Sequence, residues 1–194
     1  MAVKENYTYN RGTCAMIAGP MFAGKSSELL KRILFLEHSG KKILVLKPHI
    51  DDRYSQNQII THNGLGHDAV NVIDLELVKD NYNIKPYNFH TVFLDEIQFF
   101  ETGPTLFFVE EALREGVNIV ASGLNQDSLG VPFETTSRMM ALADEVITLK
   151  SYCMVCGRDA NKTQRLSRKS NRIVIGGAGQ YEPRCNEHWE PKWE

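Results

Sequence analysis

Residues 19–26 constrain this chain more than any other part of its sequence. They read Gly-Pro-Met-Phe-Ala-Gly-Lys-Ser, follow an apolar run and precede a stretch with apolar residues at helical spacing. This is the G-x-x-x-x-G-K-[ST] pattern of a phosphate-binding loop between a strand and a helix. In such a loop the glycines let backbone N–H groups surround an anion, and the helix adds its positive N-terminal end. The segment therefore predicts a nucleotide phosphate site.

Two side chains of this loop have specific expected roles. Lys25 can reach the β and γ phosphates, and Ser26 offers a hydroxyl oxygen to Mg²⁺, a cation that prefers oxygen ligands. The alternative is a glycine turn that only happens to precede a lysine. We expect the nucleotide to be bound by Gly19, Pro20, Met21, Phe22, Ala23, Gly24, Lys25 and Ser26.

Short apolar runs rich in β-branched residues alternate with helical patterns over the first 150 residues. Such runs are typical of parallel strands that are buried on both faces. A series of this kind predicts an α/β layer: a parallel sheet with helices on both faces and a ligand at the carboxyl ends of the strands. The predicted strands are residues 13–18, 42–46, 91–94, 117–121 and 145–149, and the predicted helices follow residue 24 and begin near Gly103-Pro104.

The strand predicted at residues 91–94 ends in two carboxylates, Asp95 and Glu96. In a P-loop protein this position supplies the second element of the metal site, so Asp95 is expected to face the Mg²⁺ held by Ser26. A glutamate at position 96 can orient a water in an ATPase or accept a proton from a hydroxyl in a kinase, and position alone does not separate the two. The alternative is an ordinary helix N-cap followed by a first-turn acid.

The alternation of strands and helices stops at Ser151, where the composition turns to Cys, Gly, Arg and Lys. We place a domain boundary near Lys150, between a P-loop, ATP-binding α/β domain at 1–150 and a small domain at 151–194. Cys153-x-x-Cys156 and Cys185-x-x-His188 are two chelating pairs. Three thiolates and one imidazole suit a tetrahedral Zn²⁺, and four protein ligands make the site structural. A redox role for the first pair would leave the second without one.

Two further features of the sequence are given no catalytic or metal-binding role. Cys14 lies in an apolar run and is expected to be a buried strand residue. Residues 161–172 hold five basic side chains, which fit either a solvated flexible loop or a flap over a phosphate or nucleoside. Those side chains are Lys162, Arg165, Arg168, Lys169 and Arg172.

Charge and hydropathy limit the partners. The formal net charge is -2 and the pI is near 6.3, which argues against the electropositive surface that a nucleic-acid-binding protein needs. The first eleven residues lack the pattern of a secretory leader, and no apolar run approaches the roughly 20 residues of a membrane span. We expect a cytoplasmic protein that binds neither nucleic acid nor a membrane.

Together, these motifs in this order resemble the type II thymidine kinases along the whole chain. Besides the phosphate loop and the zinc pairs, the resemblance rests on residues 47–54, 95–100, 123–124, 132–133 and 176–181. It implies a P-loop sheet with a zinc-ribbon-like C-terminal domain that carries a lasso-like substrate loop. The implied activity is transfer of the γ-phosphoryl of ATP to the 5′-hydroxyl of thymidine, a salvage step in DNA precursor synthesis. Glu96 is implied as the base, and Arg53 is implied to lie near the transferred phosphoryl.

The same resemblance implies a set of ligand contacts and an assembly. Asp95 and Gln98 belong with the nucleotide site, and family members form homotetramers and are inhibited by thymidine triphosphate. The family usually has an aromatic residue where Ser128 stands and an acid where Asn125 stands, so substrate affinity and breadth depend on these departures. The implied substrate contacts are Met21, Asp51, Phe99, Leu124, Ser128, Phe133 and Tyr181, with the main chain of Ile173, Val174, Ile175, Gly176 and Gly177 covering the base.

Two other classes of function remain open at this point. One is a DNA-dependent ATPase of the recombinase type, which also has a glutamate after its metal-binding strand and predicts ATP hydrolysis stimulated by single-stranded DNA. The other is a nucleotide-regulated binding module whose zinc element docks a partner.

Overall fold

The centre of the molecule is a six-stranded parallel sheet. The structure is a computed structural model that describes residues 11–49, 58–60, 66–75, 78, 86–166 and 179–191. The strand order is β5-β2-β6-β7-β1-β8, and each neighbouring pair runs parallel. The strands are β1 (Cys14–Gly19), β2 (Ile43–Pro48), β5 (Val70–Val72), β6 (Thr91–Leu94), β7 (Asn118–Leu124) and β8 (Glu145–Thr148).

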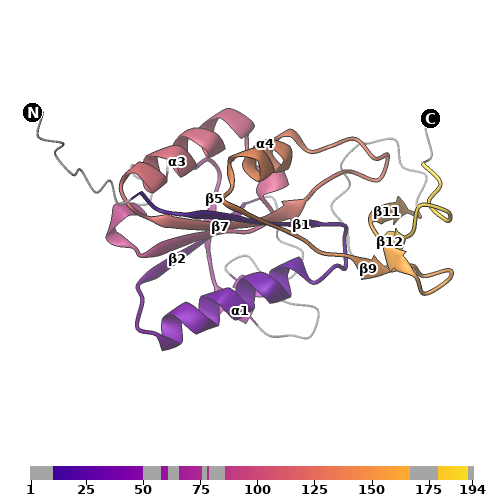
Figure 1. The fold of residues 1–194 in the computed structure, drawn as a ribbon, viewed down its shortest axis with the longest axis horizontal. Coiled ribbons are helices and arrows are strands. Elements are labelled where there is room, and N and C mark those ends of the chain that lie inside the picture. The colour runs from indigo at the N-terminus through magenta and orange to yellow at the C-terminus, as the bar shows by residue number, and fades with distance from the viewer. Residues whose placement is uncertain are drawn as a thin grey trace, which may run out of the picture.

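Helices cover both faces of this sheet. Figure 1 shows α1 (Lys25–His38) on one face and α3 (Thr102–Arg114) with α4 (Glu134–Leu142) on the other. Two short 3-10 helices, η1 (Pro86–Asn88) and η2 (Ile97–Phe99), flank β6. The predicted α/β class is thus confirmed. The five predicted strands are all present, but β8 at the edge of the sheet is mostly exposed and is not buried on both faces as predicted. β7 continues to Leu124, and neither β5 nor α4 was predicted from the sequence.

The core consists of two apolar layers because alternate strand residues point to opposite faces of the sheet. On the α1 side, Ile17 and Phe93 are fully buried together with Leu29 of the helix. On the other side, Leu94 and Ile119 pack with residues of α3 and α4 such as Val109 and Met139. Strands buried on both faces read as continuous apolar runs, which is why they were recognisable in the sequence.

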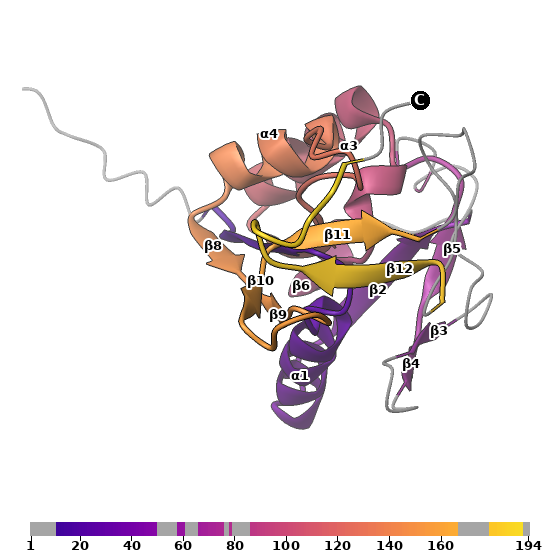
Figure 2. The same cartoon turned by 90° about the vertical axis from the view of Figure 1, so that its right-hand side faces the viewer.

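Several short antiparallel strands lie outside the sheet. β3 (Gln58–Ile60) pairs with β4 (Gly66–Asp68), β9 (Ser151–Tyr152) with β10 (Asp159–Ala160), and β11 (Lys162–Arg165) with β12 (Tyr181–Arg184). Figures 1 and 2 show β9–β12 beyond the end of the sheet at which α1 begins.

One sequence-based reading needs correction. The start of the basic segment 161–172 is not a loop, because Lys162–Arg165 is strand β11 and its Thr163 and Gln164 are buried. Residues 167–172 lie outside the described part of the chain. Among the described helices none combines the length and apolarity needed to cross a membrane.

Candidate functional site

The phosphate loop has the backbone of an anion site. Gly24, the N-cap of α1, has φ +80, a left-handed conformation that L side chains rarely adopt. Phe22 also has a positive φ of 63, which is uncommon for a residue with a side chain and marks a constrained turn. Lys25 is buried, with 8% of the residue exposed, and its ammonium donates to the Pro20 carbonyl at 2.8 Å. A charged donor therefore already lies over the loop at the N-terminus of α1.

The loop is tied to the small strands beyond the sheet. The Met21 N–H donates to Thr163 Oγ1 at 3.0 Å, and Ser151 Oγ donates to the Phe22 carbonyl at 3.1 Å. Thr163 is buried in β11, and Ser151 begins β9. Neither residue was singled out from the sequence, because no motif marks them and only the folded chain brings them to the loop.

Asp95 follows β6 at the carboxyl end of the sheet. Asp95 is 5% exposed, and Ser122 Oγ of the adjacent β7 donates to Asp95 Oδ1. β7 in turn pairs with β1, with Ser122 opposite Ile17 and Leu124 opposite Gly19. Asp95 therefore lies two strands from the start of the phosphate loop, about 10 Å across the sheet. Ser122 was missed in the sequence, although its place at a neighbouring strand end was a usable signal.

Glu96 has an unusual backbone and a specific partner. Its φ of 51 and ψ of 44 are left-handed, and it is the N-cap of η2 without a side-chain capping hydrogen bond. Its carboxylate instead accepts from Gln98 Nε2, while Gln98 Oε1 accepts from the Leu124 N–H at 3.0 Å. Because Glu96 itself is the N-cap of η2, the alternative of an N-cap at Asp95 followed by a first-turn acid does not match this geometry. Strain in a non-glycine residue is often retained at functional sites.

Hydrogen bonds link the elements that carry the expected base contacts. Phe133 and Tyr181 are 8% exposed, as is Ser128, whereas Met21 and Phe99 are half-buried. Met21 is bonded to β11, whose partner strand β12 begins with Tyr181. Asp51, Arg53 and residues 173–177 lie outside the described residues, so the roles assigned to them stay predictions.

The four predicted metal ligands do come together. The ligand atoms of Cys153, Cys156, Cys185 and His188 all lie within 4.8 Å of one another. A tetrahedral zinc places two sulfur ligands about 3.8 Å apart and a sulfur and a nitrogen about 3.6 Å apart. Cys156 Sγ lies 3.8 Å from Cys185 Sγ, and His188 Nδ1 lies 3.7 Å from Cys153 Sγ and 3.2 Å from Cys185 Sγ. The donor set and its spacing fit a structural zinc ion.

Cys153 of the cluster and Cys14 of the sheet differ in their acidity. Burial acts to raise the pKa of Cys153, but hydrogen bonds from backbone N–H groups, first that of Cys185, outweigh it and lower the pKa to about 6. For Cys14, burial and the nearby Asp144 carboxylate raise the pKa to about 12. Metals bind thiolates, so the low pKa of Cys153 agrees with its ligand role and the high pKa of Cys14 with the predicted inert, buried residue, whereas burial raises the pKa of the ligand Cys185.

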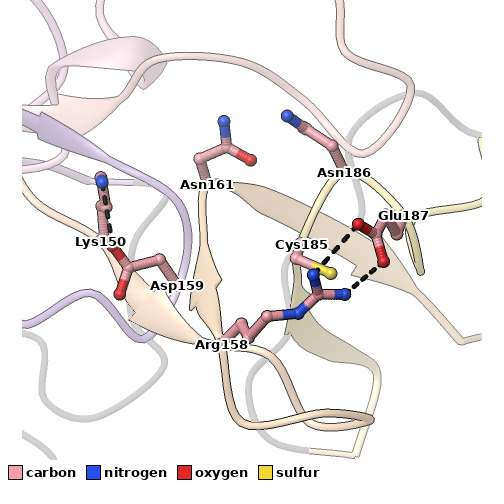
Figure 3. Close-up of a pocket in the computed structure, with 7 residues that line it drawn as sticks. All are labelled: Lys150, Arg158, Asp159, Asn161, Cys185, Asn186 and Glu187. Atoms are coloured by element: carbon pink, nitrogen blue, oxygen red, sulfur yellow. Dashed lines mark hydrogen bonds and ion pairs between the residues drawn. The ribbon is translucent and has the colours of Figure 1, made fainter.

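A polar pocket of about 360 Å³ lies beside this cluster (Figure 3). Its cations are paired with acids: Arg158 with Glu187 at 3.0 Å, and Lys150 with Asp159 at 2.9 Å. Arg158 Nε also lies 3.4 Å from Cys156 Sγ. Glu187, followed by Cys156, raises the pKa of Arg158, which therefore stays charged beside the ligand. Among the lining residues, Arg158 thus links the pocket to the cluster.

The parallel sheet, the phosphate loop and the carboxylates at the neighbouring strand ends define a P-loop nucleotide-binding protein with an appended Cys₃His element. Known sequences identify the family. The thymidine kinase family model matches residues 12–189. A thymidine kinase of Pyrobaculum aerophilum is 43% identical over 183 residues, covering 90% of this chain and 96% of the relative. One of Thermococcus kodakarensis is 38% identical over 189 residues, covering 91% and 93%. The chain belongs to the thymidine kinase family and is therefore a kinase.

A solved structure described as a DNA replication initiation factor is a distant neighbour. It is 15% identical, its TM-score is 0.40, and the match covers 71% of this chain and 40% of that one. A likeness of that size carries no argument.

Proposed function

We propose that this chain transfers the γ-phosphoryl group of ATP to the 5′-hydroxyl of thymidine. The observation that carries the proposal is the placement of Glu96 after β6, with a left-handed backbone and a carboxylate bonded to Gln98 rather than to a helix end. Two relatives of 43% and 38% identity that are named as thymidine kinases support the choice of acceptor.

ATP is assigned to the phosphate loop. The backbone N–H groups of residues 19–26 and the N-terminus of α1 would hold its phosphates, with Lys25 exchanging the Pro20 carbonyl for phosphate oxygens. Ser26 and Asp95 would hold Mg²⁺, which neutralises phosphate charge when bound, and Gln98 completes this side of the site.

Glu96 is assigned as the general base. A carboxylate there can accept the proton of the 5′-hydroxyl as the phosphoryl group is transferred. Arg53 is assigned to the transferred group, because a guanidinium presents fixed donors to phosphoryl oxygens. Positioning and charge neutralisation account for most of the rate enhancement in such a reaction.

Thymine is assigned to a pocket shared by the sheet end and the small strands. We place the ring among the side chains of Met21, Phe99, Leu124, Phe133 and Tyr181, with Asp51 and Ser128 nearby and the main chain of residues 173–177 over the base. The loss of a ring at Ser128 would cost about 1–3 kcal/mol of binding if no other group compensated. We expect deoxyuridine and analogues to be accepted more readily as a result.

The organisation of the protein is part of the same proposal. We assign residues 1–150 to the ATP-binding domain and residues 151–194 to the zinc domain. A cytoplasmic homotetramer with feedback inhibition by thymidine triphosphate follows from the resemblance to type II enzymes.

The test compares Glu96→Gln with the wild-type protein in Mg·ATP and thymidine. The wild type should form thymidine monophosphate. Glu96→Gln should lower kcat by roughly 10²–10⁴-fold, with both substrates still bound, because an acceptor of the proton has been removed. Glu101→Gln is the matched control, since Glu101 is exposed and makes no side-chain cap to α3.

Two results would reject the proposal. The first is a folded, zinc-loaded wild type that makes no thymidine monophosphate, in particular if single-stranded DNA stimulates ATP hydrolysis instead. The second is wild-type turnover by Glu96→Gln, which would reject Glu96 as the general base.

A further inference from the structure

Trp189 connects the Cys/His cluster to a loop of the α/β layer. It follows the ligand His188, and its backbone N–H donates to the Cys185 carbonyl at 3.0 Å. Its indole Nε1 donates to the carbonyl of Ser128 at 3.2 Å. One residue therefore joins the metal ligands to the loop between β7 and α4, residues 125–133.

The indole ring makes further contacts. A Cβ built on Gly130 would lie 2.8 Å from Cη2 of Trp189, so the ring packs against that backbone at a distance that only glycine permits. Lys162 Nζ lies 4.7 Å from the ring centroid and donates to Gln126 Oε1 at 3.0 Å. A buried or half-buried cation over an indole is a favourable contact. Trp189 thus contacts the loop through its indole N–H and its six-membered ring, and Lys162 of β11 lies over the ring.

The loop contacted in this way has an internally defined turn. Asp127 Oδ1 accepts from the N–H groups of Leu129 and Val131, each at 2.9 Å. These bonds shape the turn, but they do not determine where it lies relative to β11 and β12. Three hydrogen bonds link it to the small strands: Trp189 Nε1 to the Ser128 carbonyl, Lys162 Nζ to Gln126 Oε1, and Gln126 Nε2 to the Asn161 carbonyl at 2.9 Å.

We propose that Trp189 is a positioning residue for the nucleoside base, holding residues 126–130 where the thymine pocket needs them. This inference rests on the proposed function, because Leu124, Ser128 and Phe133 are thymine contacts only if the substrate is thymidine. Trp189 acts through the backbone carbonyl of Ser128, a residue that has no aromatic side chain to contact the base itself. If loosening the loop lowers the fraction of binding-competent protein, the apparent dissociation constant for thymidine rises by the inverse of that fraction.

The experiment measures thymidine and ATP kinetics for Trp189→Leu and Trp189→Phe. Trp189→Leu should raise the thymidine KM about tenfold, the effect of losing one hydrogen bond and one ring contact, with kcat and the ATP KM within about twofold. Trp189→Phe keeps a ring over Gly130 and should recover part of the loss. Tyr152→Leu is the matched control, because Tyr152 is another aromatic residue of the region after Lys150 but is 73% exposed.

Hydrogen exchange gives a second readout that does not depend on turnover. The amides of Gly130 and Val131 should exchange faster in Trp189→Leu, with β1 unchanged and with the metal content equal to that of the wild type. An unchanged thymidine KM, unchanged exchange in residues 126–131, or a loss of kcat at constant KM would overturn the inference.

If Trp189→Leu does not fold or loses its metal, Lys162→Met decides the question. It removes the cation over the ring and the bond to Gln126, so it should raise the thymidine KM about threefold, whereas an unchanged KM would overturn the inference. A wild type that does not phosphorylate thymidine rejects the proposed function instead, and the exchange measurement then still reports whether Trp189 holds the loop.

Discussion

The α/β layer and the Cys/His element are stabilised by different forces. In the layer, fully buried residues such as Phe93 and Leu94 pack against helices on both faces of the sheet. In the described residues after Ser151, the hydrophobic cluster consists of Cys153, Ala160 and Cys185. A cluster of that size is too small to order the strands around it, so we expect metal binding to supply the remaining folding free energy. We therefore expect the element that bonds to the phosphate loop to depend on a bound metal for its stability.

The largest effect should come from removing the metal. Cys185→Ala removes one of four ligands from a site whose binding contributes about 10–16 kcal/mol in small zinc domains. We expect loss of zinc and loss of hydrogen-exchange protection in β9–β12, with the sheet still folded. Thymidine phosphorylation should also be lost, because Ser151 and Thr163 no longer hold the phosphate loop.

Cys14→Ala is the control for that experiment, since Cys14 is a buried cysteine outside the cluster. It should keep its zinc and its activity. Full activity in Cys185→Ala after verified zinc loss would show that the two regions are not coupled.

The second-largest effect should come from a cavity in the apolar core of the α/β layer. Phe93→Ala creates a cavity at a fully buried site and should lower the free energy of unfolding by about 3–5 kcal/mol. Denaturant unfolding measures the loss. Zinc stoichiometry should be unchanged at low denaturant, and Phe35→Ala, at a 71% exposed position of α1, should have little effect. Zinc release in parallel with the loss of core stability would contradict independent stabilisation of the two regions.

The smallest effect should come from surface charge. Glu28 of α1 accepts from Arg32 at 3.1 Å, and Arg32 also reaches Glu145 of β8 at 3.1 Å. Burial acts to raise the pKa of Glu28, but its bonds to Arg32 and Lys31 outweigh it and lower the pKa below 4.5. The contribution of the Glu28 carboxylate to the free energy of unfolding is therefore fully present above pH 4.5. It is lost as the pH falls through the lowered pKa of Glu28 in the folded protein.

Glu28→Gln should lower the free energy of unfolding by about 0.3–1 kcal/mol at pH 7 and by less at pH 3. Glu110→Gln, which breaks a pair within α3 alone, is the matched control and should have an equal or smaller effect. A loss of several kcal/mol would mean that charge pairs, and not the apolar core, dominate the stability of the layer.

The sequence predicted some elements of the α/β layer and of the Cys/His element better than others. The inner strands of the layer were recognisable because burial on both faces requires continuous apolar residues, whereas the short edge strand β5 was missed. The phosphate loop and the ligand pairs were recognisable because anions and metals require fixed residue types at fixed spacing. α4 was missed because its burial is divided among residues such as Thr135, Thr136 and Met139, which form a weak apolar pattern.

The amino-acid order alone determined the α/β layer, the phosphate loop and the ligand set of the metal cluster, because each depends on local spacing. Only the tertiary structure decided that Thr163 bonds to the phosphate loop, that Ser122 bonds to Asp95 and that Trp189 packs on Gly130. These contacts join residues between 27 and 142 positions apart in the chain. They depend on where folded elements meet, and single hydrogen bonds of that kind leave no periodic pattern in a sequence.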